Sequence, residues 1–148
     1  AATSSPFNTT NVIITSSVNG NWSATGTWTG GVVPVAGDTV TIVTGDAVTV
    51  DTSTAACGRL ALGTGNGSAT LTFASTGNPN LTVSGAVTVG NSGQANRVGT
   101  ITFTSGSTLI CGSLLHGTTG AQASTIDMTA GGTLSVGGAI TTASTGAI

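Results

Sequence analysis

The sequence predicts an all-β protein that folds as a right-handed parallel β-helix, a β-solenoid with about 27 residues per coil. The first observation is a glycine that recurs at nearly equal intervals, at Gly58, Gly85, Gly112 and Gly138. A repeat of roughly 20–50 residues is typical of solenoids and related arrays. The second observation is that each glycine opens a short segment in which apolar and polar residues alternate, which is the pattern of a half-buried strand. Each repeat is therefore expected to form one coil.

Composition supports a folded chain without a strong charge. At 148 residues the length suits a single domain, and 4% of the residues are charged, with no Lys, Glu or Tyr. Disordered chains combine low hydrophobicity with high net charge, whereas this one is 38% apolar with a mean hydropathy of +0.39. No apolar run approaches the roughly 20 residues of a spanning helix, so we expect no membrane insertion. A net charge of −2 offers nothing to a phosphate backbone and excludes nucleic acid as an expected partner.

The start of the chain indicates secretion. It begins Ala-Ala with no Met, as a chain does after a signal peptide is cleaved at a small-residue site. The weak net charge also favours association with other surfaces. We expect an extracellular, cell-surface protein.

The N-terminal part divides into an arm and a cap. Residues 1–19 lack the glycine segment but contain a credible strand over residues 12–18. Residues 20–38 hold both tryptophans and a proline turn, and we expect them to seal the N-terminal end of the solenoid. The single solenoid domain is expected to span residues 20–148, with its coils from residue 38 onward.

The strands follow in order from residues 39–42 and 47–50, and each later coil adds two recurring strands. Alternation points one residue in two inward, and residues one coil apart stack at about 4.8 Å. Insertions between strands fall at residues 63–69, 90–99 and 117–124, on the side where solenoids often bind ligands. Three inward columns are expected: Val48/Val50, Leu71/Phe73, Ile101/Phe103 and Ile126/Met128; Leu60/Leu62, Val87/Val89, Leu114/His116 and Ile140/Thr142; and Val83, Ile110 and Val136.

Two cysteines in a secreted chain invite a disulfide. Cys57 and Cys111 both directly precede a repeat glycine, and Ser84 holds that place in the coil between them. Two coils correspond to about 9–10 Å, whereas a disulfide needs Cα atoms within about 7 Å. We therefore expect two separate, buried thiols.

The ionisable residues do not form a catalytic pattern, and we expect no enzyme activity, cofactor or metal. His116 is the single histidine and falls in an inward column, where it would be a core or corner residue rather than a general base. Glycosidase chemistry needs two carboxyl groups about 5–10 Å apart in a cleft. The four aspartates are spread over turns and strand ends, where turn and cap roles are expected: Asp38, Asp46, Asp51 and Asp127.

Outward threonines at 39/41, 70/72 and 100/102 resemble the Thr-x-Thr arrays of ice-binding solenoids. An ice-binding face needs a flat and regular array, and Asp127 interrupts the second column. Threonine is also a common outward residue of any strand. Ice binding therefore ranks third, after a structural function and carbohydrate binding.

One segment resembles a known group of proteins. The matching residues are Trp28-Thr-Gly-Gly31, Pro34-Val-Ala-Gly-Asp38, Val40-Thr-Ile42, Val48-Thr-Val50-Asp51 and Cys57-Gly-Arg-Leu60. The stretch from Trp22 to Leu62 is similar to the start of the eight-glycine domain of extracellular proteins and to the first coils of bacterial surface fibres and adhesins. The resemblance implies a right-handed β-helix, an extracellular setting and carbohydrate contact. It implies no catalytic residue.

The ends of the solenoid suggest a structural function. After the fourth glycine segment no charged strand, helix or aromatic plug covers the last coil, and an open strand edge is a template for another strand. We expect the N-terminal arm of a second copy to pair there, giving a head-to-tail filament or surface fibre. The candidate assembly residues are Val12, Ile13, Ile14, Val18, Ile140 and Ile148.

Two alternatives remain open at this point. The chain could be a carbohydrate-binding or adhesin module in which exposed Trp22 and Trp28 stack on surface glycans, although both could equally form the cap. It could also be a piece of a longer adhesin whose next domain covers the last coil. In that case the arm would fold onto its own first coil.

Overall fold

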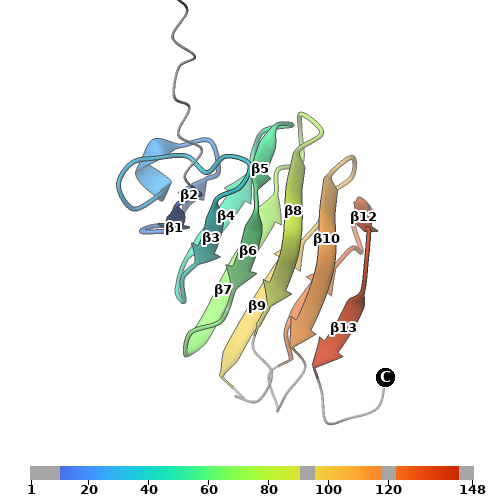
Figure 1. Cartoon of the computed structure of the whole chain (residues 1–148). Helices are drawn as coiled ribbons and strands as arrows, with labels where there is room; N and C mark the ends of the chain where they lie inside the picture. Colours follow the sequence, from blue (N-terminus) through green and yellow to red (C-terminus); the bar gives the residue numbers. More distant parts are fainter. Residues whose placement is uncertain (1–10, 91–95, 118–122, 144–148) are drawn as a thin grey trace, which may run out of the picture.

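The computed structural model describes residues 11–90, 96–117 and 123–143. These residues form a parallel β-solenoid of about five turns, with thirteen strands, one 3-10 helix and no α-helix among them (Figure 1). The predicted fold class is therefore confirmed. No helix in this part of the chain has the length and apolar character needed to cross a membrane.

Every strand pair in the two sheets is parallel, as coil stacking requires. The larger sheet has the order β1-β3-β6-β8-β10-β12, with β5 also on β8 and β13 also on β10. The smaller sheet has the order β11-β9-β7-β4-β2. The larger sheet comprises β1 (Ile13–Thr15), β3 (Thr39–Ile42), β5 (Ala55–Cys57), β6 (Arg59–Leu62), β8 (Asn80–Val89), β10 (Thr108–Gly117), β12 (Thr133–Val136) and β13 (Ile140–Ala143). The smaller sheet comprises β2 (Gly20–Asn21), β4 (Ala47–Val50), β7 (Gly67–Phe73), β9 (Arg97–Thr102) and β11 (Thr125–Asp127).

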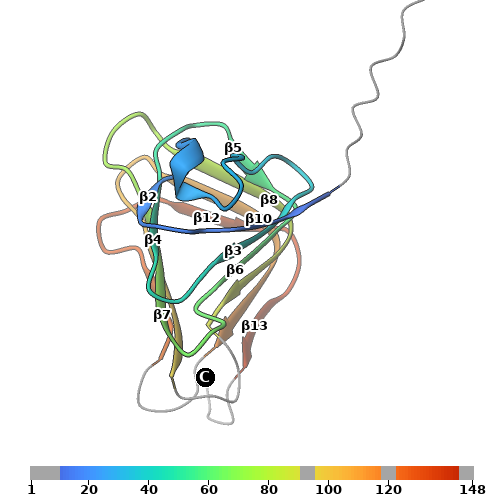
Figure 2. The same ribbon diagram turned by 90° about the vertical axis from the view of Figure 1, so that its left-hand side faces the viewer.

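The coils have a roughly triangular outline when seen down the solenoid axis (Figure 2). The smaller sheet forms one side. The other two sides belong to the larger sheet, in which β8 pairs with β5 through its first half and with β6 through its second half. β10 divides in the same way between β12 and β13. The chain turns between these two sides at the repeat glycines.

Close contact between coils explains why glycine recurs at this corner. The N–H of Gly85 donates a 2.8 Å hydrogen bond to the carbonyl of Gly58, so successive coils approach backbone to backbone. A Cβ on Gly85 would lie 2.7 Å from that carbonyl oxygen, closer than real Cβ atoms approach oxygen. A Cβ added at Gly58, Gly112 or Gly138 would likewise lie 2.6–2.8 Å from a backbone oxygen of the preceding coil. We call Gly58, Gly85, Gly112 and Gly138 the corner glycines.

The predicted stacking of core residues is confirmed on the side of the smaller sheet except at Met128, which was expected to face inward but follows the end of β11 and is 36% exposed. Val48 pairs with Leu71, Leu71 with Ile101 and Ile101 with Ile126. The rings of Phe73 and Phe103 stack with centroids 5.0 Å apart. On the second side, Leu60, Val87, Leu114 and Ile140 lie in one column in the predicted register.

The prediction for the third column was wrong at one position. Ile110 lies on the outer surface, 40% exposed, and Cys111 takes the inward place between Val83 and Val136. The segment Leu109-Ile110-Cys111 has three consecutive apolar residues, so alternation alone leaves its phase open. The buried partners Leu81 and Leu109 decide the phase in favour of Cys111.

The solenoid begins earlier than the sequence predicted. β1 lies within the predicted arm, yet it pairs with β3 as the first strand of the larger sheet, placing Ile14 beside Val40. The predicted loops are also shorter at their ends, because β7 begins at Gly67 and β9 at Arg97. Parts of the second and third loops, residues 91–95 and 118–122, lie outside the described residues.

The tryptophans seal the N-terminal end, as the cap prediction requires. Trp22 and Trp28 are both buried and meet edge to face with centroids 5.0 Å apart. The indole Nε1–H of Trp28 donates to the carbonyl of Trp22 at 2.8 Å. The N–H of Thr29 donates to the carbonyl of Thr15, which covers the outer edge of β1 at its end.

We expect Gly85→Ala to destabilise the protein by about 1–3 kcal/mol, because the added methyl group forces two coils apart. Urea unfolding followed by circular dichroism measures the change. Gly26→Ala is the matched control, since a Cβ there meets nothing within 4 Å. Equal effects of the two substitutions would contradict the proposed role of the corner.

Trp28→Ala should lower the free energy of unfolding by about 3–5 kcal/mol, because it removes a large buried ring and uncovers the first coil. Thermal unfolding provides the measurement. Val32→Ala, at an exposed position of the same segment, should change stability by less than about 0.5 kcal/mol. A small effect of Trp28→Ala would argue against a cap.

Candidate functional site

The two ends of the solenoid differ in how their core is covered. At the C-terminal end, Ile140 is 63% exposed, and Leu134 and Val136 are half-buried. Among the described residues, the edge strands β11, β12 and β13 each have a neighbouring coil on one side and none on the other. We call these three strands the open coil. The open coil presents both unpaired backbone groups and apolar side chains.

The predicted assembly residues fall at opposite ends of the molecule. Val12, Ile13 and Val18 are exposed, with Ile13 at 78%, whereas Ile14 is 4% exposed in the core. Ile140 lies on the open coil, and Ile148 lies outside the described residues. Within one chain, the described part of the arm, residues 11–19, folds onto its own first coil, because β1 pairs with β3.

The burial of both tryptophans argues against the sugar-stacking interpretation. Trp22 is 1% and Trp28 2% exposed, so neither ring offers a face to a ligand. The exposed apolar side chains of the cap are Val32 and Val35, which provide no aromatic surface. A carbohydrate contact on this chain would have to lie elsewhere.

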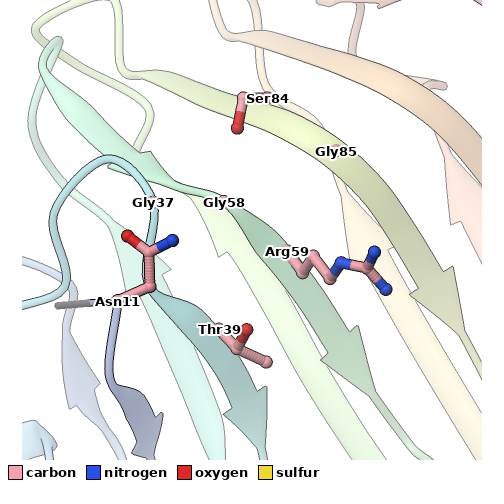
Figure 3. Close-up of a pocket in the computed structure, with 7 residues that line it drawn as sticks. All are labelled: Asn11, Gly37, Thr39, Gly58, Arg59, Ser84 and Gly85. Atoms are coloured by element: carbon pink, nitrogen blue, oxygen red, sulfur yellow. The ribbon is translucent and has the colours of Figure 1, made fainter.

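A shallow groove of about 300 Å³ lies on the outer surface beside the corner glycines. Figure 3 shows Gly37, Gly58 and Gly85 along three successive segments, with side chains at the margins. The residues that line the groove are Asn11, Gly37, Thr39, Gly58, Arg59, Ser84 and Gly85. The glycines supply a floor without side chains, and the remaining four residues supply polar groups.

Arg59 is the charged residue of this groove. It begins β6, is exposed, and pairs in register with Thr39 of the preceding coil. Its backbone N–H donates to the carbonyl of Asp38. The carboxylate of Asp38 is buried and accepts hydrogen bonds from the N–H groups of Val12 at 3.1 Å and Val35 at 2.9 Å. Among the described residues, Arg59 forms no ion pair.

The cysteines are separate buried thiols, as predicted. Cys57 and Cys111 each pair with Val83, one from either side, so they lie two coils apart. The intervening residue is Val83 and not Ser84 as expected, because β8 carries one extra residue at its corner and the register shifts there. Burial, with a smaller contribution from Asp38, raises the pKa of Cys57 to about 12, and burial also raises the pKa of Cys111.

His116 occupies the predicted column. It lies beside Val89 and Thr142 in register and is half-buried. Its Nε2 lies 2.7 Å from the carbonyl oxygen of Ser124, a hydrogen-bonding distance. This contact ties the end of β10 to the segment before β11, which is a structural role.

The predicted turn role of the aspartates is seen at Asp127, which accepts hydrogen bonds from Thr129, whereas Asp46 and Asp51 accept hydrogen bonds from the preceding coil. Asp46 accepts a 2.6 Å hydrogen bond from Ser16 Oγ, and Asp51 accepts one of 3.0 Å from the N–H of Ser23. The backbone N–H of Thr129, and then its hydroxyl, lower the pKa of Asp127. Within the described ranges, no group of three or more His, Cys, Asp or Glu residues is placed to hold a metal ion.

The outward threonines lie on two different sides of the solenoid. Thr39 and Thr41 belong to the larger sheet, whereas the other two pairs face outward from the smaller sheet. There, Thr70 pairs with Thr100 and Thr72 with Thr102. Asp127 follows Thr102, so the second column is interrupted as the sequence indicated.

Sequence reasoning missed the groove. The available signal was Arg59, which directly follows a corner glycine in a chain with just two basic residues. The glycine pattern revealed a repeat but not the hollow that it leaves on the surface.

The fold defines the class of protein: a parallel β-solenoid with one sealed end. The chain matches no family model, and no curated protein sequence or solved structure shows significant similarity to it.

The buried thiols make stability sensitive to alkaline pH. The pKa of the Cys57 thiol rises from 9.0 in the unfolded chain to about 12 in the folded one, so between these values the unfolded state binds fewer protons. Stability should be intact below pH 9 and fall as pH rises toward 12, by at most about 1.4 kcal/mol per pH unit for one proton. The chain has no Lys or Tyr to titrate in this window. Urea unfolding at stepped pH tests this, and an unchanged pH dependence in Cys57→Ala would contradict it.

Proposed function

We propose that this protein is a structural subunit of an extracellular filament or cell-surface fibre, and that its open coil is the surface for assembly. The observation that carries the proposal is the asymmetry of the two ends. A buried tryptophan pair seals the first coil, whereas Ile140 and the strand edges of the last described coil are uncovered. Soluble β-proteins normally block such an edge with charge, proline or covering structure.

The N-terminal arm of a second copy is the proposed occupant of the open coil. Within its own chain, Ile14 begins the core column that continues through Val40 and ends at Ile140. A donated β1 would place the neighbour's Ile14 against Ile140 and continue the same column. The contact joins two different surfaces and therefore propagates into a filament.

Donation requires the arm to leave its own sheet, where little apolar burial holds it. The contacts to be exchanged are mainly hydrogen bonds, among them the β1–β3 ladder and the bond from the N–H of Val12 to Asp38. Of the apolar residues at 12, 13, 14 and 18, Ile14 is the one buried, and burying one such side chain contributes roughly 1.5–3 kcal/mol. Hydrogen bonds from Ser16 to Asp46 and from the N–H of Val43 to Ser16 add to this. In strand exchange, the contacts that β1 loses in its own sheet would be replaced by similar contacts on the open coil of the neighbouring subunit, as in domain swapping.

The extracellular setting rests on other grounds. It is supported by the sparse charge and by the resemblance of residues 22–62 to surface fibres and adhesins. An adhesin module is the second candidate, because the groove beside Arg59 is accessible to a ligand, whereas the tryptophan pair is buried.

The assembly test compares Ile140→Asp with Ile110→Asp. Both replace an exposed isoleucine, but Ile110 faces outward from β10, a strand that is already paired on both sides, with β8 and with β12. Ile110 therefore lies on the lateral surface, next to the open coil but not on its uncovered edge. Negative-stain microscopy and light scattering should show filaments or higher oligomers for the wild type and Ile110→Asp. Ile140→Asp and a chain lacking residues 1–19 should remain monomeric, because a buried charge or a missing arm removes the contact.

Hydrogen exchange separates donation from self-pairing. In assembled protein, the amides of β13 should be protected more strongly than in the Ile140→Asp monomer. A wild type that stays monomeric at every concentration, with β1 protected within that monomer, would refute the proposal.

A further inference from the structure

We propose that the groove beside the corner glycines binds the carboxylate of an acidic sugar, with Arg59 as the anchoring cation. The site would give the protein a ligand-binding function in addition to its proposed structural role. The ligand class is a saccharide with uronic acid residues. The proposal depends on the floor, the walls and the charge of the groove.

The floor lacks side chains because coil packing leaves no room for a Cβ. At Gly58 and Gly85 a side chain would collide with a carbonyl of the coil below, at 2.6 and 2.7 Å from its Cβ. At Gly37 a Cβ would collide with the amide oxygen of Asn11. The floor therefore carries no side chain at these three positions, of which Gly37 and Gly85 are half-buried and Gly58 is buried. Such a floor complements the C–H face of a sugar ring.

The polar groups of the groove suit a hydroxylated ligand. Asn11, Thr39 and Ser84 present an amide and two hydroxyl groups around the floor, and Figure 3 shows the Ser84 hydroxyl directed toward it. The backbone donors of Gly58 and Gly85 are already used between coils, so recognition falls to these side chains. A volume of about 300 Å³ is at the lower end of small-molecule sites and fits one or two sugar rings.

The charge of the groove favours one carboxylate. The guanidinium of Arg59 has five donors in a fixed plane that matches a carboxylate bidentately. Its stem borders the floor at Gly85, since a Cβ there would be 3.4 Å from Arg59 Cγ, and Figure 3 shows the guanidinium at the margin of the groove. The neighbouring Asp38 does not compete for the guanidinium, because its buried oxygens accept the N–H groups of Val12 and Val35. A single cation favours a singly charged group over a phosphate or a polyanionic nucleic acid, which recruits several basic residues.

The test titrates the chain of residues 1–148 with trigalacturonic acid and, separately, with its methyl ester, which keeps the sugar and removes the charge. Binding is followed by amide chemical shifts and calorimetry. The acid should bind, shift the amides of Gly58, Arg59, Ser84 and Gly85, and weaken with added salt. The ester should bind at least about tenfold more weakly, since a charge-assisted hydrogen bond contributes about 1.5–3 kcal/mol.

Variants assign the effect to the groove. Arg59→Gln should reduce the affinity for the acid by about tenfold or more. The affinity of Arg59→Lys should lie between those of the wild type and Arg59→Gln, because lysine keeps the charge without the planar guanidinium. Arg97→Gln changes the net charge equally but lies in β9 of the other sheet, and it should bind like the wild type. Unfolding midpoints confirm that the exposed Arg59 variants remain folded.

Three outcomes would overturn the proposal. The first is a folded wild type that shows no shift at saturating acid. The second is equal binding of the acid and its ester. The third is a loss in Arg97→Gln that matches the loss in Arg59→Gln. Binding in the monomeric Ile140→Asp variant would show that the site does not depend on assembly.

Discussion

The backbone contact between successive corner glycines is the constraint on which the rest of the structure depends. A hydrogen bond of 2.8 Å from Gly85 to Gly58 holds two coils at a separation that admits no Cβ. That separation brings the inward side chains of each coil into contact, so Phe73 meets Phe103 and the columns form one core. The same lack of side chains leaves a hollow on the outer surface. One steric requirement thus sets the repeat, the core and the groove.

The middle coils of a solenoid are covered by the coils on either side, whereas each end must be covered by something else. Here the N-terminal end is sealed by Trp22 and Trp28, while the C-terminal end of the described chain exposes Ile140 and the edges of its strands. In the proposed assembly, this difference between the two ends of the described chain gives the subunits a direction. A directional contact is what linear assembly requires, and it is compatible with binding on the lateral surface.

The chain has few charged residues, and three of its aspartates accept hydrogen bonds that join neighbouring segments. Asp38 and Asp51 accept backbone N–H groups, and Asp46 accepts the hydroxyl of Ser16, so these carboxylates act as local braces. Arg59 stands apart from this pattern, because it is exposed and lines the margin of the groove. In a protein with so little charge, one cation in a defined hollow has a large influence on which ligand can be held.

The sequence by itself determined the repeat, the parallel strands and most of the core, because alternation and a glycine at nearly constant intervals are properties of local sequence. It also placed the cysteines two coils apart correctly. Tertiary structure decided which side chains of a strand face inward and at which residue the first coil begins. The buried neighbours Leu81 and Leu109 turned Ile110 outward, and the first sheet position drew Ile14 into the core. The groove could not be found from the sequence, because a hollow is made by residues of different coils that only stacking brings together.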